Sequence, residues 1–259
     1  MYELNACELA QTSEIKKLIE PYTGNNAGEK EFDFWKKWEN DPVPAAAGII
    51  SGDNLRMIYS YCAPFGDVLM PGAVDPFPDG LLARYQESNI NALWLTVLLS
   101  DLVPWTGDED YSENYLLRQA TLRKFVEKLA KYGLKLILYL NEPRALPEAI
   151  AQRHPDWCGP ENANNSKTRA ICVSNPAVAE ALRKGVADLC KAVPGLGGFL
   201  TITMSENLTH CLSRATIGEC ERCKEHSDPA KNVVTVLSAI RNGMLDAGSD
   251  GRLIAWNWA

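Results

Sequence analysis

The sequence has little positive charge: its 33 acidic residues outnumber its 26 lysines and arginines, and the formal net charge is -7. Proteins that bind nucleic acid or an anionic membrane surface need a basic face, so no nucleic-acid partner is expected. The sequence also lacks an apolar run of the roughly 20 residues that cross a bilayer, and no membrane partner is expected. Its start, MYELNACELAQTSEIKKLIE, lacks the basic and apolar segments of a secretory signal. The expected localisation is cytoplasmic.

Phosphate-binding motifs are missing as well. The stretch YCAPFGD, which follows the first β-rich run, contains neither G-x-G-x-x-G nor a P-loop. A nucleotide-binding sheet is therefore disfavoured. The apolar share of 46% and the charged share of 23% are those of an ordinary globular protein.

Two regions differ in pattern. Residues 1–47 are polar with a helical pattern, and we expect an N-terminal extension there. From residue 48 to residue 259, β-rich runs alternate with amphipathic helical patterns. The β-rich runs cover 54–64, 90–104, 134–143, 197–205 and 251–259, and the helical patterns cover 80–89, 113–132, 147–153, 177–193 and 230–248. This alternation predicts an α/β protein with a parallel sheet covered on both faces.

The spacing of the units bears on the type of sheet. Units of about 40 residues, with loops after the strands, favour a (β/α)8 TIM-type barrel over a doubly wound sheet. A closed barrel of this type needs eight strands, whereas five are visible. We therefore expect only the first five or so β/α units, in a barrel domain over 48–259 that is incomplete at its C-terminal end. The alternative is an open five-stranded sheet.

Polar and aromatic residues gather where the predicted strands end. In a barrel these ends face the active site, and carboxylates, amides and indoles together suit a carbohydrate substrate. The candidate catalytic residues are Asp101, Glu142 and Glu206, and the candidate sugar contacts are Tyr61, Trp105, Asn141, Asn207, Trp256 and Trp258. Glycosidase carboxyls lie ~5 to 5.5 Å apart for retention and ~6.5 to 9.5 Å apart for inversion. Neighbouring strands lie ~4.8 Å apart, so both separations are reachable.

Three stretches carry a family resemblance: YGLKLILYLNEPRALP, VPGLGGFLTITMSENLTHC and CERCK. With the residues around them they resemble bacterial glycoside-hydrolase-like barrels related to family 20 β-N-acetylhexosaminidases. The resemblance implies a TIM barrel that acts on carbohydrate, with Glu206 as the general acid. In family 20 an Asp precedes that Glu, whereas Ser205 stands here, and a hydroxyl cannot supply the negative charge of that Asp.

A second clan offers another assignment. Its retaining hydrolases carry Asn-Glu, often followed by Pro, after strand four. Asn141-Glu142-Pro143 matches that motif. If an additional strand lies within residues 1–47, Glu142 becomes the acid/base, and the clan's nucleophile would lie beyond Ala259. We favour Glu206.

The sequence holds eight cysteines. Five are scattered and are interpreted as reduced, buried thiols. The other three form the pattern Cys211-x8-Cys220-x2-Cys223, whose spacing suits tetrahedral zinc with His210 or His226 as a fourth ligand. Unligated thiols and a disulfide are the alternatives.

These observations predict a glycosidase, that is, an O-glycosyl hydrolase with a strand-end Glu as general acid. It requires no cofactor for catalysis, and any zinc would be structural. The alternative is a non-catalytic carbohydrate-binding or scaffold barrel with a zinc-stabilised cysteine loop.

Overall fold

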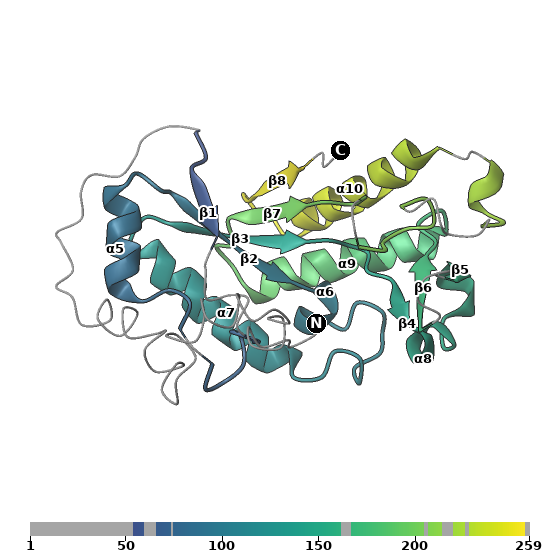
Figure 1. Ribbon diagram of the computed structural model, residues 1–259, viewed down its shortest axis with the longest axis horizontal. Helices are drawn as coiled ribbons and strands as arrows, with labels where there is room; N and C mark the ends of the chain where they lie inside the picture. The colour runs from purple at the N-terminus through teal and green to yellow at the C-terminus, as the bar shows by residue number, and fades with distance from the viewer. Residues whose placement is uncertain are drawn as a thin grey trace, which may run out of the picture.

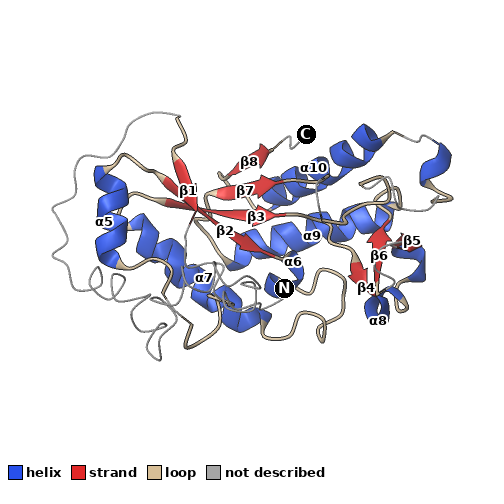
Figure 2. Cartoon of the chain, viewed as in Figure 1, coloured by secondary structure: helices blue, strands red, loops and turns tan. Residues whose placement is uncertain are grey.

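The computed structural model describes residues 54–59, 66–73, 75–161, 167–204, 207–213, 220–225 and 228–256. The predicted N-terminal extension, residues 1–47, lies outside these ranges. Strands and helices alternate along the chain (Figures 1 and 2). The strands of the main sheet are β1 (Met57–Tyr59), β2 (Ala92–Val97), β3 (Lys135–Leu140), β7 (Gly198–Thr201) and β8 (Arg252–Ala255). The helices are α5 (Asp79–Glu87), α6 (Leu99–Leu102), α7 (Tyr115–Ala130), α8 (Glu148–Ala151), α9 (Pro176–Ala192) and α10 (Pro229–Asp246).

The strands of the main sheet are all parallel, in the order β1-β2-β3-β7-β8. Each strand therefore adds to the same edge, without the reversal of order that defines a doubly wound sheet. Each of the five β-rich runs predicted from sequence contains one of these strands. Within the described residues the sheet is open, with β1 and β8 at its edges. The predicted α/β class and parallel sheet are confirmed, whereas a closed barrel is not formed by this part of the chain.

The two faces of the sheet differ. Leu93 and Leu95 of β2 pack in the main core with residues of α5, α7, α9 and α10. Their neighbours Ala92 and Trp94 point to the other face, in a second cluster with Ile137 and further residues. All four long helices thus contact one face, and the other face carries the second, smaller cluster. The reason is geometric: right-handed crossovers that always advance in one direction place every helix on the same side.

The face away from the main core carries an aromatic row. The ring centroids of Tyr59 and Trp94 are 4.3 Å apart, and those of Trp94 and Tyr139 are 5.4 Å apart. These three side chains come from β1, β2 and β3. Trp94 is therefore a packed residue of this face, which agrees with its position in the middle of a strand.

The carboxyl ends of the central strands are level with one another. In the register of the sheet Val97 pairs with Leu140, Leu140 with Thr201, and Thr201 with Ala255. The residues that follow these four strands consequently emerge at one edge. Because each strand there is hydrogen-bonded to its neighbour, side chains distant in sequence come together at this edge.

A second, small sheet lies beyond that edge, on the right in Figure 1. It consists of β4 (Leu146–Pro147), β6 (Thr168–Ile171) and β5 (Cys158–Glu161), paired antiparallel in that order. The segment 158–168 reads as a Gly/Asn-rich loop in the sequence, and for 158–161 that reading is wrong. A four-residue strand containing Gly and Pro has no detectable apolar period, so only its pairing with β6 defines it.

Helices α9 and α10 each begin at a residue whose side chain caps the helix. Asn175 caps α9, with its side-chain oxygen accepting a hydrogen bond of 3.0 Å from the Ala177 N–H, and Pro176 is the first helical residue. Asp228 caps α10 in the same way. None of the helices in the described ranges is both long and apolar enough to cross a bilayer.

Candidate functional site

Glu142 lies two residues after the buried end of β3, and it is 1% exposed. Its two carboxyl oxygens each accept a hydrogen bond from a backbone N–H. Oε1 accepts from Leu99 at 2.8 Å and Oε2 accepts from Arg144 at 2.7 Å. The carboxyl group therefore joins the first residue of α6, which follows β2, to the loop that follows β3.

Burial dominates the electrostatics of Glu142. Loss of solvation raises the pKa of this carboxyl from 4.5 to about 7, although the N–H groups of Leu99 and Arg144 and the charge of Arg144 act in the opposite direction. The negative charge of Asp101 raises it further. A carboxyl with this pKa exchanges its proton near neutral pH.

Asp101 lies on α6, two residues after Glu142's partner Leu99, and it is partly exposed. Burial raises the pKa of Asp101, the nearby charge of Arg118 lowers it, and that of Asp67 raises it, with a net upward shift. Arg118 is not free to neutralise Asp101 alone, because its Nε donates to Asp67 Oδ2 at 2.7 Å.

Tyr111 belongs to the same group of side chains. Burial raises the pKa of its phenol, a hydrogen bond with Ser100 lowers it, and the charges of Glu142 and Asp101 raise it. The phenol is therefore linked electrostatically to both carboxyls. We call Asp101, Tyr111, Glu142 and Arg144 the carboxyl cluster. The sequence gives no signal for Tyr111, since it lies in the irregular segment between α6 and α7.

The loop after β7 adjoins the carboxyl cluster. The N–H of Ala145, three residues after Glu142, donates to the carbonyl oxygen of Leu208 at 3.0 Å. Asn207 and Leu208 are partly exposed there. Asn141, also at this edge, is 3% exposed. The predicted general acid, Glu206, lies outside the described residues, as do Tyr61 and Trp258.

The two remaining aromatic candidates differ in their surroundings. Trp105 is 8% exposed, its ring stacks on Trp157 with centroids 6.1 Å apart, and it packs against Gly185 of α9. It lines a cavity of about 240 Å³ between the residues after α6 and helices α7 and α9. That cavity includes no member of the carboxyl cluster. Trp256, by contrast, is 45% exposed after the end of β8, and its backbone N–H donates to the Thr201 carbonyl oxygen.

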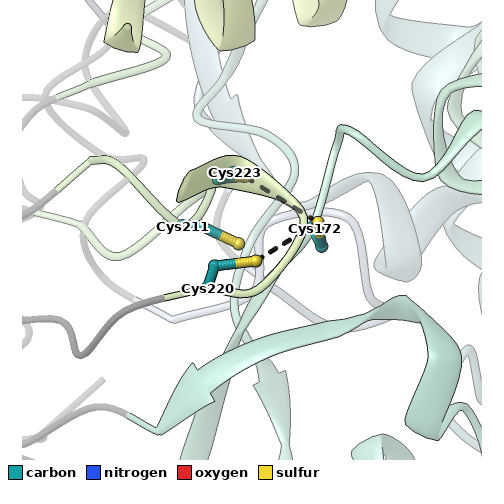
Figure 3. A group of neighbouring side chains, drawn as sticks. All are labelled: Cys172, Cys211, Cys220 and Cys223. Atoms are coloured by element: carbon teal, nitrogen blue, oxygen red, sulfur yellow. Dashed lines mark hydrogen bonds between the residues drawn. The ribbon is translucent and has the colours of Figure 1, made fainter. Parts of the chain in front are cut away.

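Four buried cysteines form a separate cluster, shown in Figure 3. The Sγ atoms of Cys172, Cys211, Cys220 and Cys223 all lie within 4.8 Å of one another. Three of these residues are the ones that the spacing pattern indicates. The fourth, Cys172, follows β6 and comes from a distant part of the chain, where the sequence reads it as an ordinary buried thiol. We call this group the four-cysteine cluster.

His210 occupies the position next to the cluster rather than a place within it. The side chain is fully buried, and its Nδ1 accepts a hydrogen bond of 3.2 Å from the Leu212 N–H. Among the described groups that could hold a metal ion, this cluster consists of cysteines alone. Burial lowers the pKa of His210 to about 4, which keeps the imidazole neutral. His226, the other histidine considered, lies outside the described residues.

No protein-family model matches the sequence, and no curated protein matches it. Solved structures match the fold. An α-galactosidase from Lactobacillus brevis matches with a TM-score of 0.50 and 13% identity over 79% of this chain and 27% of that chain. A GH36 α-galactosidase from Geobacillus stearothermophilus matches with a TM-score of 0.49 and 13% identity over 78% of this chain and 28% of that chain. A β-glucosidase from Trichoderma harzianum matches with a TM-score of 0.41 and 15% identity over 83% of this chain and 48% of that chain.

These similarities concern the fold. The chain spans about a quarter of the length of the two α-galactosidases. The match to the Lactobacillus enzyme shows that this chain shares the parallel α/β fold of part of that structure. None of the three is a family 20 hexosaminidase, so that resemblance stays a prediction.

Proposed function

We propose that this chain forms part of a glycoside hydrolase-type enzyme that cleaves glycosidic bonds in a carbohydrate. The observation that carries the proposal is the carboxyl cluster at the carboxyl edge of the parallel sheet. Burial raises the pKa of Glu142 to about 7, and Asp101 is coupled to it. Enzymes of this class use carboxyls whose pKa values are separated by their surroundings. The likeness of the fold to part of an α-galactosidase supports the same class.

Within this proposal Glu206 remains the proton donor. It precedes Asn207 directly, and the hydrogen bond between Ala145 and Leu208 ties the following residues to the loop that begins at Glu142. A proton donor on the loop after β7 would act beside the carboxyl cluster. Asn207 and Trp256, which solvent reaches, are the proposed sugar contacts at the same edge, whereas Asn141 is buried.

Glu142 itself is better suited to positioning than to attack on the sugar. Both of its oxygens are occupied by backbone N–H groups, and the side chain is 1% exposed. It would hold the loops after β2 and β3 together and set the charge felt by Asp101. Asp101, which is partly exposed, is the proposed second carboxyl.

Substitution tests these roles. The full-length protein would be assayed with a panel of aryl α- and β-glycosides that differ in leaving-group pKa. Glu206→Gln should lower turnover by about 10²- to 10⁴-fold, the usual contribution of a general acid. The loss should be greatest for the poorest leaving groups, because they depend most on protonation. Glu87→Gln, an exposed change at the end of α5, is the matched control and should be silent.

Two outcomes would contradict the assignment. If Glu206→Gln keeps full activity on a substrate that the unaltered protein cleaves, Glu206 is not the acid. If Asp101→Asn also keeps full activity, the carboxyl cluster does not take part in the chemistry.

The occupied oxygens of Glu142 favour one other function, a non-catalytic carbohydrate-binding barrel. That function predicts saturable binding of an oligosaccharide, measured by calorimetry, without turnover of any aryl glycoside in the panel. The non-catalytic function would be established if the unaltered protein has no hydrolytic activity and the double variant Glu206→Gln, Asp101→Asn still binds the oligosaccharide.

A further inference from the structure

The four-cysteine cluster brings three segments of the chain to one point. Cys172 follows β6 of the small sheet, Cys211 lies in the loop after β7, and Cys220 and Cys223 flank the start of the 3-10 helix η3 (Cys223–Glu225) before α10. All four side chains are buried, at 8% exposed or less. We propose that these four thiolates bind one zinc ion as a structural, tetrahedral site.

The distances between the sulfurs fit this geometry. A zinc–sulfur bond of about 2.3 Å in a tetrahedron requires sulfurs about 3.8 Å apart. Cys172 Sγ lies 3.6 Å from Cys220 Sγ and 3.9 Å from Cys223 Sγ. A disulfide would need ~2.05 Å. A cubane iron–sulfur cluster would hold its thiolates much farther apart, because inorganic sulfides and four irons lie between them.

The surroundings favour charged sulfur. Ser174 Oγ lies 3.3 Å from Cys223 Sγ, and the Asn232 side chain donates to the same sulfur at 3.8 Å. Buried thiolates at this spacing repel one another unless a cation lies between them, and an all-sulfur tetrahedron selects zinc or iron.

The four-cysteine cluster lies in close contact with strand β5. A Cβ built on Gly159 of β5 would collide with Cys211 Sγ. The small sheet therefore packs directly on the sulfurs. With four protein ligands no coordination position stays open for water or substrate, so the ion is structural. It would cross-link the small sheet to the loop after β7.

The inference does not depend on the glycosidase proposal, and its test measures metal. The full-length protein, produced without a histidine tag and dialysed against metal-free buffer, would be analysed for zinc and iron by mass spectrometry. We expect one zinc per chain. Cys172→Ser should lower the zinc content to background, whereas Cys158→Ser should leave it unchanged. Cys158 is the matched control, because it lies in the adjacent strand and its thiol contacts the Ala151 and His154 carbonyls instead.

A second measurement covers the case in which Cys172→Ser fails to fold. Replacing the metal of the unaltered protein with Co²⁺ should produce visible d–d bands and strong near-ultraviolet thiolate-to-cobalt charge transfer of a four-thiolate site. Protein without metal whose four thiols react at once with a thiol reagent would overturn the proposal. So would one iron per chain, a disulfide within the cluster, or full zinc content in a folded Cys172→Ser variant.

Discussion

Replacing Glu142 by Gln removes one ionisable group from the core and nearly preserves its shape. The wild-type carboxyl accepts hydrogen bonds from the N–H groups of both Leu99 and Arg144. The amide of Gln has one oxygen, so one of these buried donors faces an NH₂ group and loses its acceptor. An unsatisfied buried donor costs about 1–3 kcal/mol. This cost is present at every pH.

The second effect of the change depends on pH. Burial raises the pKa of Glu142 in the folded protein from 4.5 to about 7. The folded state therefore binds the proton more tightly than the unfolded state, and the free energy of unfolding falls as pH rises through this window. At about 1.4 kcal/mol per pH unit, the wild type loses about 3 kcal/mol in total, most of it between pH 5 and pH 8. The Gln variant has no such loss.

The assay compares the two proteins by denaturant unfolding at several pH values from 5 to 8. The wild type should exceed the Glu142→Gln variant in unfolding free energy at pH 5, and this difference should shrink by about 2–3 kcal/mol by pH 8. Titrating groups that do not interact with Glu142 cancel in the difference. Glu87→Gln, on the exposed end of α5, should show a constant offset near zero. A difference that stays flat, or that grows with pH, would show that the backbone N–H donors outweigh burial and would refute the reasoning.

Two further changes test the packing and the start of the helices. A Cβ on Gly243 of α10 would collide with the Arg183 carbonyl of α9, so Gly243→Ala should destabilise the protein by about 1–3 kcal/mol. Ser238→Ala, at an exposed site of α10, should be near neutral in the same thermal denaturation. Asn175→Ala removes the cap that accepts from Ala177 and should cost about 1 kcal/mol. Equal melting temperatures for Gly243→Ala and Ser238→Ala would contradict the packing prediction for Gly243. An unchanged melting temperature for Asn175→Ala would contradict the capping prediction.

The elements of the main sheet follow from local pattern. The run around β3 is almost continuously apolar, as expected for a parallel strand buried on both faces. The start of α9 follows from Asn175 and Pro176, which act through hydrogen bonds and torsion angles of neighbouring residues. Such signals are complete within a few residues, and for this reason the order and type of these elements are legible in the chain.

The small sheet and the fourth cysteine follow no such pattern. β5 contains Gly159 and Pro160, and its strand conformation depends on pairing with β6. Cys172 is 39 residues from Cys211 and joins it only because the loop after β7 returns to β6, where Ile171 and His210 form a bridge. A contact of this length has no local signature. The spacing rule therefore indicated a neighbouring histidine instead.

The carboxyl cluster lies between these cases. Residue type and position after an apolar run identify Asp101 and Glu142 as strand-end acids, because parallel strands present their carboxyl ends at one edge. The state of Glu142 depends on something else: the level register of β2 and β3, which brings the Leu99 N–H to its oxygen and encloses the group away from water. A pKa depends on the free energy of charge in its three-dimensional surroundings, and those surroundings exist only after distant segments have packed together.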